Sequence, residues 1–339
     1  MSSEEKKVFE EEDLILSDNH PQEPYRRRKD EEKKSIAYGQ RKLLLTLLYF
    51  ITYIVNKFKR EKYIIVYAGA APGNNIQIIA DLFKDKANIE WHLYDPAPFK
   101  IQTNWNNRFF VYQKKFDEDT AKYWKSVNEF TDSVSDSVND DVNDSVNNKN
   151  VFFISDIRTA DYTQTNNLEE NEEQIMGDMQ LQREWVEMIR PIASLLKFRL
   201  PYAIPGMPEE IKYLDGVLYK QPYAPQTSTE CRLLVSSVKL TYKNYNCKKY
   251  ESQMFYHNVI IREHKKYINE CKGTDDELID DYDSSAEVYI LGLICKSNKE
   301  ICELSRMITD KLSIGKKTKD TLKYLRDNPQ TIKKRNFHR

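Results

Sequence analysis

"YIIVYAGAAPGNNIQIIADLF", residues 63–83, contains an apolar run, a glycine-rich corner and a helical pattern in immediate succession. The apolar run predicts a buried strand that ends near Ala68. Beyond the corner, apolar residues recur at helical spacing, which predicts a helix over 74–86. A strand, a tight turn and a helix form the repeating unit of α/β proteins. This stretch therefore indicates an α/β fold.

Similar units follow along the chain. Helices are expected over 40–57, 117–127 and 168–189, and the chain beyond about residue 250 is expected to be mostly helical. Further strands are expected over 89–96, 108–113, 151–155, 191–202 and 230–237. Their alternation predicts a doubly wound sheet of short parallel strands flanked by helices. No strong linker divides the chain, so we expect a single domain.

Charge and sequence complexity vary along the 339 residues, although the formal net charge is only −1. Residues 1–33 are acid-rich, and we expect this segment to be disordered or only loosely attached. The repeat over 131–150 consists mainly of Ser, Asn, Asp and Val, which predicts a disordered loop inserted into the domain 34–312. Residues 313–339 form a basic tail that can attract phosphates or simply be solvated.

Cysteine and apolar patterns exclude several classes of protein. The five cysteines lack CxxC spacing and are odd in number, so free thiols are expected and no metal site is indicated. The most apolar run, "LLLTLLYFITYIV" at 43–55, has thirteen residues, whereas a bilayer span needs about 20. We interpret this run as a buried helix and expect no membrane association.

The glycine corner and a downstream acid suggest a nucleoside-containing cofactor. Gly69 and Gly73 would let the backbone approach a ligand, and Asp95 ends the next strand, where a carboxylate can bind a ribose diol. The spacing is G-x-x-x-G rather than G-x-G-x-x-G, and Pro72 lacks an N–H group for a diphosphate. This departure favours S-adenosylmethionine, with NAD and a turn that binds nothing as alternatives.

A second strand end carries charge. In "NVFFISDIR", residues 150–158, an apolar run stops at Asp156 and Arg158. Ligands bind at the carboxyl edge of parallel strands in open α/β sheets. A ligand site at this edge and an ordinary charged surface loop are both compatible with this stretch alone.

Four segments together resemble a known family. These are "YGQRKLLL" (38–45), "VYAGAAPGNNI" (66–76), "ISDIR" (154–158) and "PIASLLKFRLPY…QPYAPQTSTECRLL" (191–202 and 221–234). Their order and spacing resemble the poxvirus-type cap-specific mRNA (nucleoside-2′-O-)methyltransferase family, whose members are also small regulatory subunits of poly(A) polymerase. The resemblance covers roughly residues 36–262.

The resemblance implies a Rossmann-like sheet that binds S-adenosyl-L-methionine. It implies methyl transfer to the ribose 2′-OH of the first transcribed nucleotide of capped mRNA. It also implies a viral poly(A) polymerase catalytic subunit as a partner, and a location in the virus factory of the host cytoplasm and in the virion. The alternative is a non-catalytic or dual-role processivity subunit of that polymerase.

The resemblance also implies residue roles. The catalytic set falls on Lys42, Asp156, Lys197 and Glu230. Donor contacts fall on Gln40, Tyr67, Gly69, Gly73, Asp95, Phe116 and Asp156. Cap and RNA contacts fall on Tyr25, Tyr202, Ser228, Thr229 and Glu251. Two positions depart from the family pattern, because Ala97 replaces an arginine and Ile204 replaces an acid.

The residue types suit the reaction. An alcohol attacks a methyl group poorly unless its proton is removed or its oxyanion is stabilised. A lysine is normally an ammonium ion at neutral pH, and burial or a neighbouring cation favours the neutral amine. The resemblance assigns this amine to Lys197. The alternatives are structural: a lysine whose stem lies along apolar surface, and ordinary packing of Tyr25 and Tyr202.

Overall fold

A computed structural model of the chain describes residues 6–26, 38–101, 108–133, 150–159, 167–236, 239–269, 271 and 280–312. Contacts divide the chain into two compact units. One unit comprises Met1–Thr52, Lys220–Glu230 and Lys249–Arg339, and the other comprises Tyr53–Tyr219 and Cys231–Lys248. The sequence led us to expect a single domain. The units interleave along the chain, so no linker marks the division.

The second unit is built on a seven-stranded sheet with the order β4-β3-β2-β5-β6-β9-β8. Neighbouring strands from β4 to β6 are parallel, whereas β9 runs antiparallel to β6. The strand bounds are β2 Tyr63–Ala68, β3 Ile89–Tyr94, β4 Phe109–Tyr112, β5 Val151–Ser155, β6 Ala193–Phe198, β8 Val217–Lys220 and β9 Cys231–Ser236. The predicted α/β sheet is confirmed, with a mixed rather than wholly parallel order.

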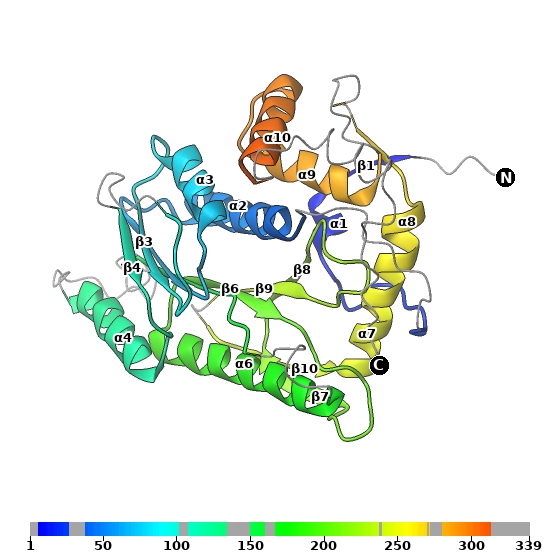
Figure 1. The fold of residues 1–339 in the computed structure, drawn as a ribbon, viewed down its shortest axis with the longest axis horizontal. Helices are drawn as coiled ribbons and strands as arrows, with labels where there is room; N and C mark the ends of the chain where they lie inside the picture. The colour runs from blue at the N-terminus through cyan, green and yellow to red at the C-terminus, as the bar shows by residue number, and fades with distance from the viewer. Residues whose placement is uncertain are drawn as a thin grey trace. The chain divides into compact units, whose positions relative to one another are not determined.

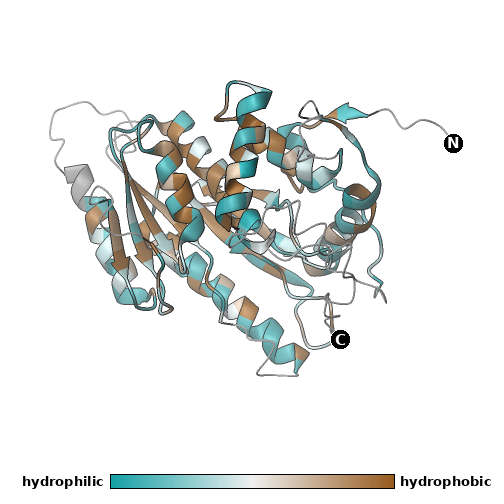
Figure 2. Ribbon diagram, turned by 45° about the horizontal axis from the view of Figure 1, so that its top comes forward, coloured by the Kyte–Doolittle hydropathy of each residue, from teal (hydrophilic) through white to brown (hydrophobic). Residues whose placement is uncertain are grey.

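Apolar strands explain why this sheet forms the core. Ile65, Val66, Phe152 and Phe153 on β2 and β5 are fully buried. Strands covered on both faces are continuously apolar, and Figure 2 shows the central strands as mostly hydrophobic. Helix α3 (Asn74–Phe83) lies on one face, and α4 (Glu118–Ser133) and α6 (Leu168–Ile189) lie on the other (Figure 1).

The expected helix 168–189 is confirmed at both ends. The Asn167 side chain caps α6 by accepting a hydrogen bond from the Glu169 amide, and Glu169 and Glu170 lie in its first turn. Carboxylates at a helix N-terminus interact favourably with the helix dipole. Two further strands, β7 (Glu210–Leu214) and β10 (Tyr242–Asn246), form a small antiparallel sheet that the sequence analysis did not predict.

The first unit is mainly helical. Strands β1 (Lys7–Val8) and β11 (Tyr267–Ile268) pair in parallel within it. Its helices are α1 Glu11–Leu14, α2 Tyr38–Phe58 (whose last turns belong to the other unit), α7 Cys247–Tyr256, α8 Arg262–His264, α9 Tyr282–Gly292 and α10 Asn298–Leu312, with a π-helix η1 at His257–Ile261. No helix in the described ranges has both the length and the apolar character needed to cross a bilayer.

The expectation of a disordered segment over 1–33 is wrong for residues 6–26. Phe9, Leu14 and Leu16 are buried, and the Phe9 ring lies 5.0 Å from the Tyr267 ring. These few apolar side chains anchor an otherwise acidic segment. Residues 134–149 of the repeat and the basic tail 313–339 lie outside the described residues, whereas 131–133 belong to α4.

Candidate active site

The site begins where the strand order reverses. From β2 the chain continues outward through β3 and β4, whereas β5 and β6 lie on the other side of β2. Open α/β sheets bind ligands at such a switch point, beside the carboxyl ends of the strands. The switch point here lies between β2 and β5, which lead directly into Gly69 and Asp156.

Gly69 and Asp156 are in close backbone contact. The Asp156 amide donates to the Ala68 carbonyl oxygen at 2.9 Å. Gly69 has φ +81°, and a Cβ built there would lie 2.7 Å from the Asp156 carbonyl carbon. Only glycine tolerates both this conformation and this approach. The glycine corner and the charged strand end therefore form one site.

Asp95 is held against the same corner. Its Oδ2 accepts a hydrogen bond from the Ala71 amide at 3.1 Å, and its Oδ1 accepts one from the Ala97 amide at 2.8 Å. Each carboxylate oxygen has a second lone pair. The carboxylate is therefore fixed in position and keeps acceptor capacity for the hydroxyl groups of a ribose.

The remaining candidate donor residues lie in different surroundings. Gly73, at φ +83°, precedes α3. Tyr67 is buried in β2, and Phe116 packs against the Trp185 ring at 4.8 Å within an aromatic cluster. Gln40 lies in the part of α2 that belongs to the first unit. The structure thus brings Gly69, Gly73, Asp95 and Asp156 to one sheet edge, and Phe116 has an evident packing role.

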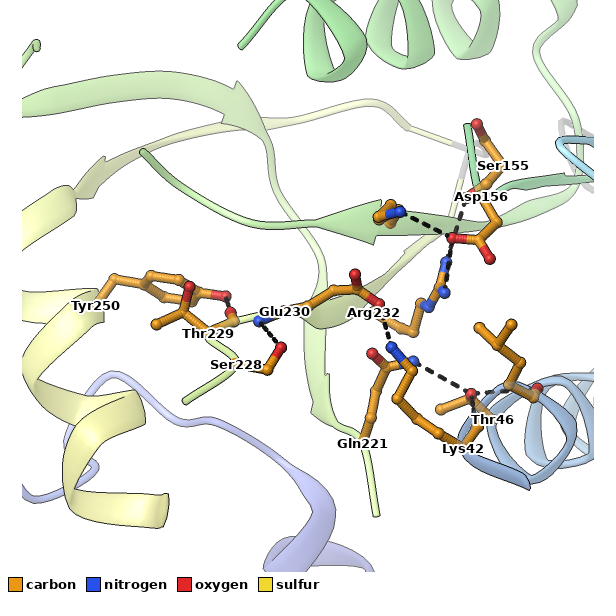
Figure 3. A network of polar contacts seen from close by, with 12 residues as sticks. Lys42, Thr46, Ser155, Asp156, Gln221, Ser228, Thr229, Glu230, Arg232 and Tyr250 are labelled. Atoms are coloured by element: carbon orange, nitrogen blue, oxygen red, sulfur yellow. Dashed lines mark hydrogen bonds and ion pairs between the residues drawn. The ribbon is translucent and has the colours of Figure 1, made fainter. Parts of the chain in front are cut away.

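Asp156 forms ion pairs with two basic side chains. Arg232 Nη2 lies 2.9 Å from Asp156 Oδ1 (Figure 3). Lys197 Nζ lies 3.3 Å from the same oxygen. Lys197 on β6 and Arg232 on β9 are register partners. The Arg232 side chain is only 3% exposed. The Lys197 and Arg232 cations therefore share one carboxylate oxygen. Because the three side chains are largely removed from solvent, their electrostatic interactions are stronger than they would be in water.

Sequence reasoning missed Arg232. The available signal was an arginine inside the otherwise apolar strand "CRLLV", two residues after Glu230. A buried arginine requires a partner, and its partner Asp156 is far away in sequence. Only the pairing of β6 with β9 shows that the two residues meet.

The other half of the predicted catalytic set lies in the first unit. Lys42 Nζ lies 2.7 Å from Glu230 Oε1, and both side chains are largely buried (Figure 3). The Glu230 amide donates to Ser228 Oγ at 3.2 Å. Asn258 Nδ2 donates to the Ser228 carbonyl, and the Tyr250 hydroxyl donates to the Thr229 carbonyl. These contacts fix the loop that carries Glu230.

The structure therefore pairs Lys42 with Glu230 in one unit and Lys197 with Asp156 in the other. That both pairs serve one reaction stays a prediction of the resemblance. Among the described residues, no group of three or more His, Cys, Asp or Glu side chains could hold a metal ion.

The predicted cap residues are also distributed over both units. In the first unit, Glu251 is buried on α7, and the Tyr25 ring meets the edge of Phe255 of the same helix at 5.3 Å. The buried Thr229 hydroxyl has no hydrogen-bond partner among the described residues. In the second unit, Tyr202 lies beneath the Arg199 guanidinium, at 4.2 Å from the ring centroid. The Ile204 amide donates to the Tyr202 carbonyl at 2.9 Å.

Comparisons with known proteins show which proteins this chain is similar to. A family model described as poly A polymerase regulatory subunit matches residues 11–299. The chain is 30% identical over 232 residues to the cap-specific mRNA (nucleoside-2′-O-)-methyltransferase of fowlpox virus (strain NVSL), covering 66% of this chain and 68% of that protein. The protein of the same name from myxoma virus (strain Lausanne) is 27% identical over 230 residues, which are 66% of this chain and 61% of that protein.

A solved structure, titled "The structure of bluetongue virus VP4 reveals a multifunctional RNA- capping production-line", covers 80% of this chain and 40% of its own chain, with 16% identity and a TM-score of 0.42. The seven-stranded sheet and the similarity in sequence to the fowlpox virus methyltransferase together define an α/β protein of the methyltransferase class. The chain belongs to the poly A polymerase regulatory subunit family. This confirms the resemblance noted in the four sequence segments.

Proposed function

We propose that the protein transfers a methyl group from S-adenosyl-L-methionine to the ribose 2′-OH of the first transcribed nucleotide of capped mRNA. One observation carries this proposal. Lys197 and Arg232 both contact Asp156 at the switch point, directly beside the glycine corner. This places a lysine amine at the sheet edge where α/β proteins bind ligands.

The glycine corner fits the proposed methyl donor. Gly69 lets the backbone at Asp156 approach the corner closely, and Asp95 presents acceptors suited to the ribose diol. Pro72 removes one N–H group that a diphosphate would need, whereas S-adenosylmethionine has no phosphate. When bound, this donor supplies a methyl group on a positively charged sulfur. Gly69, Gly73, Asp95 and Asp156 would hold it.

Lys197 is the proposed catalytic amine. Asp156 orients its ammonium, and Arg232 adds a second positive charge to the same carboxylate. The 2′-oxygen forms a bond to the methyl carbon while the carbon–sulfur bond breaks, and sulfur keeps that bond's electron pair. The hydroxyl proton passes to the unprotonated amine of Lys197, and the resulting ammonium is paired with Asp156. Lys42 and Glu230 are the second proposed catalytic pair.

Cap recognition is proposed for aromatic and acidic side chains. Tyr202 and Tyr25 would stack on the methylated guanine, which is a cation. Glu251 would accept hydrogen bonds from the base, and Ser228 and Thr229 would contact the cap nucleotide. Because Ile204 is apolar, Glu251 is the main acidic group proposed for this pocket.

A product analysis tests the reaction. The purified protein is incubated with isotopically labelled donor and RNA that has a methylated cap and an unmethylated first ribose. Label is expected on the first nucleotide only. The control is the same RNA with a 2′-deoxy first nucleotide, which lacks the acceptor oxygen. No label on the first RNA, or equal label on both RNAs, would overturn the proposed function.

A second candidate function is that of a processivity subunit for a viral poly(A) polymerase catalytic subunit. The description of the matching family model favours this role. The test measures tail length with and without the protein at a fixed polymerase concentration. Unchanged tails would contradict this role. A host-cytoplasmic location in the virus factory, and presence in the virion, are proposed from the resemblance and are tested by immunofluorescence and virion proteomics.

A further inference from the structure

Glu172 connects a helix to the segment that carries Tyr202. Its two carboxylate oxygens accept from the two terminal nitrogens of Arg199, each at 2.9 Å. Oε2 also accepts from the Tyr202 backbone amide at 3.0 Å. The Glu172 side chain is fully buried, and that of Arg199 is 11% exposed. A bidentate pair of this kind fixes both partners in angle as well as in distance.

The same arginine covers the tyrosine ring. The Arg199 guanidinium carbon lies 4.2 Å from the Tyr202 ring centroid, which is a close cation–π contact. Glu172 therefore holds Tyr202 twice, once through its backbone amide and once through the cation that lies over its ring.

Helix α6 supports neighbouring segments in the same way. Asp178, six residues after Glu172, accepts from both the amide and the hydroxyl of Thr159, which follows the Asp156 strand end. Gln182 donates to the carbonyl oxygen of Lys197 at 3.0 Å. One helix thus directs buried polar side chains to three segments that carry proposed site residues. We infer that α6 is a positioning element for the site.

We propose that Glu172 and Arg199 are positioning residues that adapt Tyr202 to stack on a cationic base. This inference rests on the proposed function. A cation on one side of an aromatic ring would repel a second cation stacking on the other side. Glu172 neutralises Arg199, so that a flat ring is held in place without a net positive charge behind it. The pair would thereby favour the methylated, positively charged guanine over the neutral unmethylated base.

Because Glu172 and Arg199 carry opposite charges, replacing one or the other should change the selectivity for methylated caps in opposite directions. Glu172→Gln leaves the Arg199 charge uncompensated, so the ratio of affinities for methylated and unmethylated caps should fall by about tenfold. Arg199→Gln removes the positive charge and leaves the Glu172 carboxylate behind the ring, so this ratio should rise although both affinities fall. A purely structural role would lower both affinities by the same factor in either variant.

The experiment measures binding of methylated and unmethylated dinucleotide cap analogues at one fixed salt concentration. Glu173→Gln is the matched control, because Glu173 is the exposed neighbour on the same helix. The control should bind as wild type does. Affinity for S-adenosylhomocysteine and the melting temperature report whether each variant is folded. If Glu172→Gln does not fold, the ratio of methylated to unmethylated cap affinities in Arg199→Gln tests the positioning role by itself.

The outcomes separate the two claims. An unchanged ratio in Glu172→Gln, or a ratio that does not rise in Arg199→Gln, overturns the positioning role and leaves the proposed function intact. A wild-type protein with no preference for the methylated cap overturns this inference together with the proposed cap pocket, whereas failure of the labelling experiment overturns the proposed reaction. A ratio that falls in Glu172→Gln, rises in Arg199→Gln and is unchanged in Glu173→Gln supports the inference.

Discussion

Lys197 and Arg232 occupy opposite positions in the antiparallel pairing of β6 and β9, and both contact Oδ1 of Asp156. The guanidinium is nearly inaccessible to solvent, whereas the Lys197 side chain is 19% exposed. The accessible cation of the two is therefore the lysine. The arginine is placed to hold the carboxylate and to add positive charge near the amine.

Replacing Arg232 tests this arrangement. Arg232→Met leaves Lys197 as the cation on Asp156 Oδ1, which alters the orientation of the amine and removes a positive charge beside it. We expect the methyl-transfer rate to fall by at least about tenfold, with donor affinity nearly unchanged. Single-turnover assays and calorimetry measure the two quantities. Arg306→Met on the exposed surface of α10 is the control, and a wild-type rate in Arg232→Met would show that the arginine is dispensable.

Gly69 tests the close approach at the switch point. In Gly69→Ala, the new Cβ must avoid the Asp156 backbone at 2.7 Å while φ stays at +81°. We expect a loss of about 1–3 kcal/mol in unfolding free energy and weaker donor binding. Gly177→Ala in α6 is the control, because a Cβ there meets no atom within 4 Å. Equal stability of the two variants in urea titrations would contradict the close contact.

Asp95 tests the ribose contact. Asp95→Asn keeps the size of the side chain but loses the charge and one acceptor. Affinity for S-adenosylhomocysteine should fall about 10- to 100-fold, because charge-assisted hydrogen bonds to a ligand are lost. Isothermal calorimetry gives the affinity, and exposed Asp85→Asn is the control. Unchanged affinity in Asp95→Asn would rule out the assignment.

Two histidines in the first unit predict a pH dependence of stability. Burial lowers the pKa of His20 from 6.5 to about 3, and burial also lowers the pKa of His257 well below its usual value, with Lys220 adding to both shifts. Neither His257 nitrogen has a hydrogen-bond partner among the described residues. In the unfolded chain both imidazoles gain protons below about pH 6.5, whereas the folded protein keeps them neutral.

The stability contributed by these neutral imidazoles is therefore present above about pH 6.5 and is lost as the pH falls. Each histidine should contribute a slope of about 1.4 kcal/mol per pH unit between about pH 6 and pH 5. Urea unfolding at several pH values measures this slope. His257→Leu removes one of the two imidazoles, so the slope of unfolding free energy against pH should fall by the contribution of one proton. A slope identical to wild type would contradict the lowered pKa of His257.

Local sequence signals predicted the strands of the large sheet except β8, but not their partners. The apolar runs of β2, β3 and β5 and the capped helix α6 were recognisable because their patterns are continuous and strongly periodic. Strands β7 and β10 were missed because "EIKYL" and "YKNYN" are polar and their pairing is non-local. For the same reason, neither the Arg232–Asp156 pair nor the Glu172–Arg199 pair could be predicted from the sequence.

The contacts between residues of the candidate site were equally hard to predict from the sequence. Residue types and order along the chain indicated Lys42, Asp156, Lys197 and Glu230, and the structure adds which of them pair. The acidic composition of residues 6–26 obscured the few apolar anchors, such as Phe9, that attach this segment. Composition describes the average of a segment, whereas burial depends on individual side chains.

Single-turnover methyl transfer by Lys197→Ala, compared with wild type, tests the central claim most directly. The substrate is RNA with a methylated cap and an unmethylated first ribose, and donor affinity is measured in parallel. We expect 2′-O-methylation by wild type, less than about a tenth of that rate in Lys197→Ala, and nearly equal donor affinity in both. A variant that keeps more than this fraction of the rate while binding donor normally would contradict the assignment of Lys197 as the catalytic amine.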